Sequence, residues 1–129
     1  IYLQMSIMEP PKFLAGFNLP DLKLPTGRRD VTNVPSQALI MLNDPFVNAM
    51  ARLWAAGLTS QRDATAEDRV RGMFARALGR EPCGSELERW CSALKDFAST
   101  PEDTLMKDSI GWERLAHVLF NTKEFIYFR

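Results

Sequence analysis

The residues of this sequence whose types best suit chemistry lie between positions 28 and 44. They carry guanidinium, carboxylate, amide and hydroxyl groups: Arg28, Arg29, Asp30, Thr32, Asn33, Gln37, Asn43 and Asp44. The planar fork of arginine suits carboxylates, sulfates and sugar acids, and the amides and carboxylates suit sugar hydroxyls. Two interpretations follow. The cluster either binds such a ligand or satisfies the backbone donors and acceptors of an irregular segment, and we favour the second.

No other group of residues in the sequence predicts a catalytic or metal site. His117 is the only histidine and lies between Ala116 and Val118 in a helical pattern, so we expect it on or partly under a helix surface. One histidine without a cysteine cluster does not predict a transition-metal site. The acidic residues fall where helix caps and solvated helix faces need them: Glu67, Asp68, Glu86, Glu88, Glu102 and Asp103. We therefore expect no catalytic residue, no metal and no cofactor.

Composition and charge restrict the class of protein. The chain has 129 residues, of which 46% are hydrophobic, and this suits a single domain, 1–129, with its own core. Sixteen Lys and Arg balance sixteen Asp and Glu without a basic cluster, so we expect no binding to nucleic acid. No apolar run approaches the roughly 20 residues of a transmembrane helix. Arg69, Arg76 and Arg80 share one helical stripe with acidic residues nearby, which predicts a solvated face.

The two cysteines are predicted to be free thiols. Cys91 lies on the apolar stripe of a helical pattern, whereas Cys83 lies just before that helix. A disulfide would have to reach from the loop to the second turn, which is long for its geometry.

Prolines separate an irregular arm, residues 1–35, from the helical remainder. Five of the eight prolines fall in this arm, so long helices and central strands are not expected there. "IYLQM" could be a short strand, and "PPKFLAGF" predicts one helical turn from Pro11. The apolar residues of the arm are expected to pack on the helices that follow.

Residues 36–58 predict two helices that meet at a corner. Ser36 can cap the first helix, and Asp44 can cap the second with Pro45 in its first position. The second helix is predicted to have an apolar side with spacing i, i+3, i+4 and i+7, formed by Val47, Met50, Ala51 and Trp54. Gly57 is expected to end the second helix.

Residues 65–129 predict a three-helix module. Thr65 with Asp68 resembles a capping box, and Gly79 is expected to end the helix that they begin. Ser85 with Glu88 predicts the capping box of the next helix. After the turn-rich "ASTPEDT", a last helix runs from about 109 to 121, and "KEFIYF" forms a short helical turn or an extended tail. The predicted fold is all-α, with the proline-rich arm packed on a bundle of four to five helices.

The stretch "GRRDVTNVPSQALIMLNDPFV", residues 27–47, resembles the hallmark of a planctomycete-type domain of unknown function. That domain closes large secreted or envelope proteins, often after cytochrome-c-like domains. The resemblance extends upstream through "IYLQMSIMEPPKFLAGFNLPD" and downstream to "LAHVLFNTKEFIYF". It implies that the chain is the C-terminal portion of the domain, that it belongs to an exported protein, and that any haem lies in a separate domain.

A weaker likeness covers residues 67–128. "FARALGREP", Trp90 and "LFNTKEF" are similar to a helical module of secreted bacterial adhesins and phycobilisome linker proteins. That module connects and assembles proteins.

Two functions are therefore carried forward. The first is a non-catalytic docking or assembly module that binds other domains of its parent protein or envelope proteins, in the periplasm, on the cell surface or outside the cell. The alternative is a domain that binds or processes polysaccharide through Arg28, Arg29, Asn33, Gln37, Asn43 and Asp44. Trp54 or Tyr2 would then serve as an exposed platform for a sugar.

Overall fold

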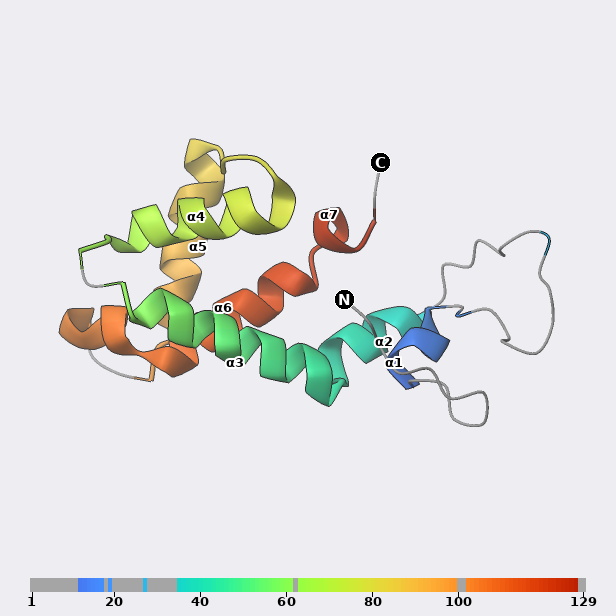
Figure 1. Cartoon of the computed structure of the whole chain (residues 1–129). Helices are drawn as coiled ribbons and strands as arrows, with labels where there is room; N and C mark the ends of the chain where they lie inside the picture. The colour runs from blue at the N-terminus through green and yellow to red at the C-terminus, as the bar shows by residue number, and fades with distance from the viewer. Residues whose placement is uncertain are drawn as a thin grey trace.

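The computed structural model of the chain describes residues 12–17, 19, 27, 35–61, 63–99 and 102–127. These residues are helical, turn or irregular, and no strand occurs among them, which confirms the all-α prediction. The elements in chain order are α1 (Lys12–Gly16), α2 (Pro35–Asn43), α3 (Pro45–Thr59), α4 (Ala66–Leu78), α5 (Gly84–Phe97), the 3₁₀ helix η1 (Glu102–Lys107), α6 (Ser109–Phe120) and α7 (Lys123–Ile126). Figure 1 shows their arrangement.

Most of the predicted arm, including the expected strand in "IYLQM", lies outside the described residues. Within the arm, the predicted helical turn is present as the short helix α1, which contacts α2. The ring of Phe13 in α1 lies beside the ring of Phe46 in α3, with centroids 5.4 Å apart. The packing of the rest of the arm stays a prediction.

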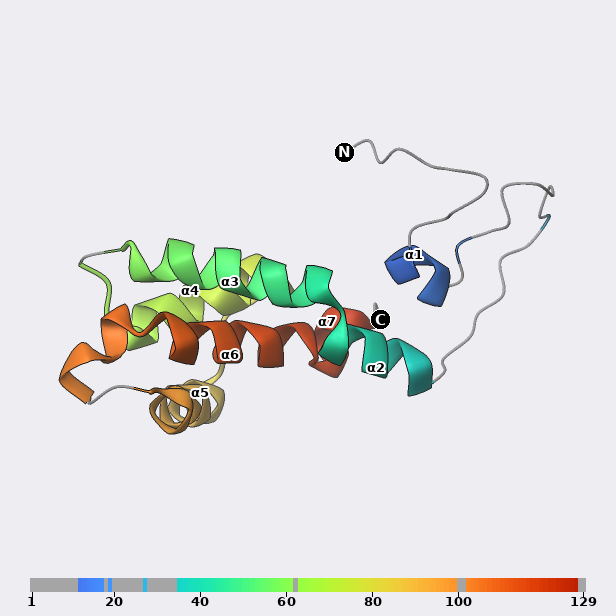
Figure 2. The ribbon, with the colours of Figure 1, turned by 90° about the horizontal axis from the view of Figure 1, so that it is seen from below.

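The corner between α2 and α3 forms as the sequence predicts. Asp44 takes an extended backbone conformation, φ −68° and ψ 130°, and its Oδ1 accepts a hydrogen bond from the Phe46 N–H at 2.8 Å. Pro45 occupies the start of α3, where a missing N–H is harmless. In Figures 1 and 2, α2 meets the start of α3 at an angle. The proline therefore marks the beginning of a helix.

The predicted end of α3 at Gly57 is wrong, because the helix continues to Thr59. Glycine ends a helix when it adopts a positive φ, and among the described glycines only Gly79 does so, at 68°. The hydroxyls of Thr59 and Ser60 bond back to helix carbonyls, and the Ser60 N–H donates to the Ala56 carbonyl at 3.2 Å. These polar groups end α3 two residues later than predicted.

Two further boundary predictions have opposite outcomes. The Thr65–Asp68 capping box at the start of α4 is confirmed, with Asp68 Oδ2 accepting from the Thr65 N–H at 3.0 Å. The Ser85–Glu88 capping box is wrong, since α5 begins two residues earlier than predicted, at Gly84, with Cys83 as its N-cap. Glu86 instead accepts from the Cys83 N–H at 2.9 Å, so the same spacing is used two residues upstream.

The core is organised around α6, which lies between α3 and α5 (Figure 2). The largest fully buried side chains of the core come from α4, α5 and α6: Val70, Met73, Phe74, Leu94, Trp112, Leu115 and Leu119. Each such side chain contributes about 1.5–3 kcal/mol to stability by leaving water. The Trp112 indole N–H donates to the Leu105 carbonyl of η1 at 3.2 Å, so the core satisfies its largest polar group.

The segment before α6, expected to be turn-rich, contains η1 and a buried cap. Asp108 is buried and accepts from the Ser99 N–H at 2.6 Å and from the Ile110 N–H at 3.0 Å. Gly111 follows in the first turn of α6, where an added Cβ would lie 3.3 Å from the Cα of Ala98. The start of α6 is thereby held close to the end of α5. Residues 123–126 of the "KEFIYF" segment take the helical alternative, as α7.

Candidate functional site

The polar cluster predicted from the sequence divides into two groups. Arg28, Arg29, Asp30 and Asn33, with Thr32, lie outside the described residues, so their placement stays a prediction. Gln37, Asn43 and Asp44 are described. Gln37 is buried near the start of α2, whereas the other two lie at its end, about 9 Å away along a helix that rises 1.5 Å per residue.

Two of the described members, Asn43 and Asp44, are engaged with backbone. Asn43 Nδ2 donates to the Leu39 carbonyl at 3.0 Å, and the Asp44 carboxylate caps α3. Trp54, a suggested sugar platform, is half-buried and stacks on Phe120 of α6, with ring centroids 5.3 Å apart. These contacts agree with the interpretation in which polar side chains satisfy an irregular corner.

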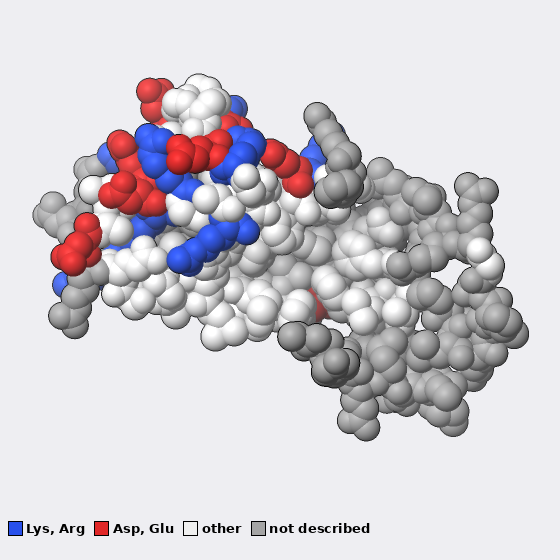
Figure 3. Space-filling model, turned by 45° about the horizontal axis from the view of Figure 1, so that its top comes forward, with Lys and Arg blue, Asp and Glu red and all other residues white. Residues whose placement is uncertain are grey.

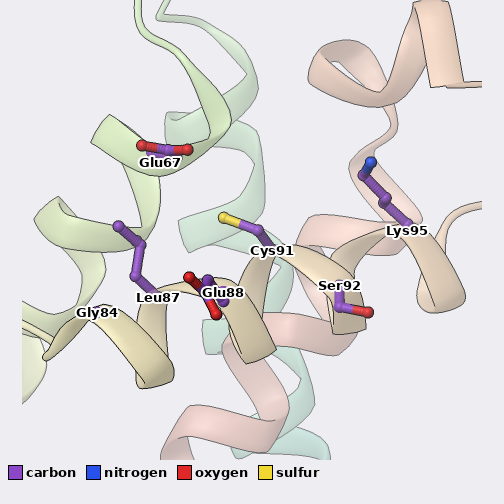
Figure 4. Close-up of a pocket in the computed structure, with 7 residues that line it drawn as sticks. All are labelled: Glu67, Gly84, Leu87, Glu88, Cys91, Ser92 and Lys95. Carbon is purple, nitrogen blue, oxygen red and sulfur yellow. The ribbon is translucent and has the colours of Figure 1, made fainter.

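A hollow of about 480 Å³ lies between α4 and α5. Its lining residues are Glu67, Gly84, Leu87, Glu88, Cys91, Ser92 and Lys95. Figure 4 shows the Cys91 sulfur directed into the space below Glu67 of α4. Burial raises the pKa of the Cys91 thiol, and the Glu67 carboxylate raises it further. Cys91 is therefore protonated at neutral pH, which makes it a poor nucleophile.

The expected absence of a disulfide is confirmed, since Cys83 and Cys91 are both free. His117 is partly buried in α6, as predicted, and its Nε2 is buried without a hydrogen-bond partner in the part of the chain that the structure describes. No group of three or more His, Cys, Asp or Glu side chains among the described residues is arranged to hold a metal ion.

The prediction that Arg69 lies on a solvated face is wrong. Its side chain is only 3% exposed and donates to the carbonyls of Met106 and Gln61, at 2.6 Å in the first case. The guanidinium carbon also lies 5.4 Å from the centre of the Trp112 ring. Arg69 precedes the buried Met73 by four residues, and this spacing was the available signal that it faces the core edge. Burial lowers its pKa, although it remains a cation.

Arg80, from the same predicted stripe, lies in the connection between α4 and α5 and links it to α5 and α7. Its guanidinium forms bidentate hydrogen bonds with Glu124 of α7, at 2.7 Å, and with Glu86 of α5, at 2.9 Å. A further hydrogen bond to the Glu81 carbonyl uses the last N–H group. Hydrogen bonds from Arg80 lower the pKa of Glu86 to about 2, and hydrogen bonds with Glu124 and Glu86 raise the pKa of Arg80. This cluster is structural.

The most unusual surface of the described chain is apolar and lies on α2 and α3. Four large side chains there are strongly exposed: Leu39 (58%), Leu42 (47%), Phe46 (54%) and Leu53 (66%). Among residues 35–51 the only charged residue is Asp44, whose carboxylate caps α3. We refer to these four residues as the α2–α3 face. The helical spacing in the sequence predicted an apolar side for each of these helices but did not predict that this face is exposed.

Charged side chains gather elsewhere. Figure 3 shows them concentrated over the part of the molecule that contains α4 and α5, and a largely uncharged described surface beyond it. Large exposed apolar patches on soluble proteins commonly mark sites of interaction. Among the described residues, no helix combines the length and the apolar content needed to cross a membrane.

Comparison with known proteins places the chain in a family. Residues 1–94 match the family model PSD1, a protein of unknown function (DUF1553). No curated protein and no solved structure matches the chain. The match to the family model includes residues 27–47 and covers more than two thirds of the 129 residues. The chain therefore belongs to the PSD1 family, a planctomycete-type domain of unknown function.

Proposed function

We propose that this chain is a non-catalytic docking module of an exported multidomain protein, and that it binds a neighbouring domain or another envelope protein through the α2–α3 face. The observation that supports this proposal is the exposure of Leu39, Leu42, Phe46 and Leu53 in a region with a single, structurally engaged carboxylate. The exported context follows from the family resemblance.

Burial of this face would supply binding free energy without a cost for removing charges from water. Each Å² of apolar surface that leaves water contributes about 25 cal/mol. Charged groups would instead have to be paired as they were desolvated. Arg52, the nearest arginine in α3, already donates from Nε to Glu113 of α6 at 3.0 Å. The α2–α3 face is therefore suited to a partner that is itself apolar.

The polar groups that the structure describes also support a binding role over a catalytic one. Asp44 and Asp108 cap helices, Arg69 holds two carbonyls, and Arg80 is fully engaged with its two carboxylate partners. The Cys91 thiol is held in its protonated form. These groups stabilise the fold that presents the α2–α3 face.

The test is a capture experiment with envelope extract of the source organism, using the chain and two variants. Leu42→Glu alters the face, and Ile110→Glu is the matched control, because Ile110 is 45% exposed on α6. Bound proteins and glycans are identified by mass spectrometry. We expect a defined set of envelope proteins that is lost with Leu42→Glu and retained with Ile110→Glu.

Equal recovery with both variants would contradict docking through this face. Recovery of a glycan that is lost with Gln37→Ala or Arg28→Ala, without a change in melting temperature, would instead favour the carbohydrate alternative.

A further inference from the structure

Helix α3 is apolar on two opposite sides, but the chain covers only one of them. Its inner side, Val47, Ala51, Ala55 and Leu58, is buried, and α3 packs on α6. Its outer side is exposed at Phe46, Ala49, Leu53 and Ala56, which we call the α3 seam. Helices that are apolar all round are normally buried all round. Phe46 contacts Phe13 of α1, with ring centroids 5.4 Å apart, and is still 54% exposed. Most of the α3 seam is therefore left exposed by the described chain.

The spacing of the α3 seam suits a second helix as its partner. Its four residues are separated by three, four and three positions, which is the spacing of a and d positions in a heptad repeat. Such a seam lies along one edge of the helix and packs against another helix at a shallow angle of about 20°.

The order of large and small residues along the α3 seam makes it complementary to itself. Consider an antiparallel pair whose two-fold axis crosses the α3 seam at the level of residue 51. Phe46 of each copy then faces Ala56 of the other. Leu53 of each copy likewise faces Ala49 of the other. Large side chains meet small ones at every layer, which is the arrangement that lets facing helices interdigitate. Such a pairing is isologous and closes as a dimer.

The charges beside the α3 seam permit this pairing. Positions flanking a and d select partners through their charges, and here Pro45, Met50 and Gly57 are uncharged. Arg52 is the one charged residue of α3, and it is paired with Glu113 of its own chain. Two copies can thus approach without unpaired like charges between them.

We infer that α3 pairs in antiparallel orientation with α3 of a second copy of this chain. This inference rests on the proposed docking function and names one partner of the α2–α3 face. Leu39 and Leu42 of α2 lie outside the pairing and remain open to another domain.

The first experiment is sedimentation velocity across a range of concentrations, with the unmodified chain, Leu53→Glu and Ile110→Glu. We expect a reversible dimer. Leu53→Glu should raise its dissociation constant about 100-fold or more, because each dimer loses two buried leucines. Ile110→Glu should leave the constant unchanged. Ala49→Glu, at another exposed position, repeats the test if Leu53→Glu folds poorly, and circular dichroism confirms that each variant is helical.

The second experiment determines the orientation. Ala49→Cys and Leu53→Cys are prepared separately on a Cys83→Ser background, mixed and oxidised. An antiparallel pair brings position 49 of one copy opposite position 53 of the other, within the 4.4–6.8 Å between Cα atoms that a disulfide requires. Crosslinks between the two variants should therefore exceed crosslinks within either one.

The outcomes separate this inference from the docking function. A chain that stays monomeric at all concentrations, or a dimer unaffected by Leu53→Glu and Ala49→Glu, overturns the pairing of α3. Predominant Ala49→Cys homodimers overturn the antiparallel orientation. If envelope proteins are still captured in a manner that depends on Leu42, docking stands and only the second copy is excluded. The remaining outcome is a dimer that is weakened by Leu53→Glu, together with envelope proteins that are captured equally by all variants. It supports the pairing of α3 and excludes docking of another protein on the α2–α3 face.

Discussion

The α2–α3 region and the α4–α5 region differ in the surface that their helices expose to solvent. In α4 and α5 the outer surface is charged, and several of its charges are paired, as in the Arg80 cluster with Glu86 and Glu124. In α2 and α3 the outer surface is apolar and almost uncharged. The first region is complete within the chain, whereas the second has an uncovered apolar surface. The paired charges that stabilise the fold and the face that we propose for binding therefore lie in different parts of the described chain.

The largest effect that would sharpen this comparison is expected at Arg69. Arg69→Ala removes the donors to the Met106 and Gln61 carbonyls, which then remain unpaired near the core. We expect a loss of about 2–4 kcal/mol in the free energy of unfolding. Urea denaturation measures it, and Arg76→Ala, at an exposed position of the same helix, is the control with a change within about 0.5 kcal/mol. Equal changes in the two variants would show that Arg69 is not a structural residue.

A smaller effect is expected at the corner that joins α2 to α3. Asp44→Ala removes the side-chain acceptor of the Phe46 N–H. Loss of such a cap costs about 1 kcal/mol, and Asp44→Asn should recover most of it. Thermal or urea unfolding gives the values. A stable Asp44→Ala variant that loses a bound ligand would reassign Asp44 to a binding site.

The Arg80 cluster predicts a pH dependence that is specific to the charged region. The pKa of Glu86 is lowered to about 2, below its value of 4.5 in an unfolded chain. Its contribution to stability is therefore present above pH 4.5 and is lost as the pH falls from 4.5 toward 2. Glu86→Gln should show a shallower decline over this window when urea midpoints are compared. Parallel profiles would indicate that the pair with Arg80 does not form in solution. The effect should be modest, because the pair is accessible to solvent.

The smallest effect on stability is expected at the α2–α3 face. Leu42→Glu and Leu53→Glu should change the free energy of unfolding of the monomer by about 0.5 kcal/mol or less, because both side chains are exposed. The same variants should have the largest effect on binding. Urea denaturation at low protein concentration measures the first quantity. A strong destabilisation of the monomer would mean that this face is covered by the chain itself.

Local signals in the sequence predicted several helix boundaries correctly because they depend on neighbouring residues. The Asp44–Pro45 start of α3, the Thr65–Asp68 box and the left-handed Gly79 each involve side chains within a few positions of the groups that they satisfy. The errors have the same origin. Gly57 adopts helical geometry, so α3 continues past it. At the start of α5, Cys83 and Glu86 have the same spacing as Ser85 and Glu88, and Arg80 binds the Glu86 carboxylate.

The candidate site was less predictable. Of the polar cluster, the described members Gln37, Asn43 and Asp44 are separated along α2 and engaged locally or buried. The α2–α3 face was missed because an apolar residue on a helix has the same type whether it faces the core or the solvent. Only the position of α6 on one side of α3 showed which side was left uncovered.

The sequence by itself determined the helical class, the caps at Asp44, Thr65 and Gly79, and the family, because these depend on periodicity, on groups a few residues apart and on the match over residues 1–94. The tertiary structure alone decided which arginines are buried and which apolar residues are exposed. Arg69 meets carbonyls 8 and 37 positions away, and Arg80 meets Glu124, 44 positions away. Contacts over such separations arise from the packing of whole helices, and no local pattern in the chain specifies them.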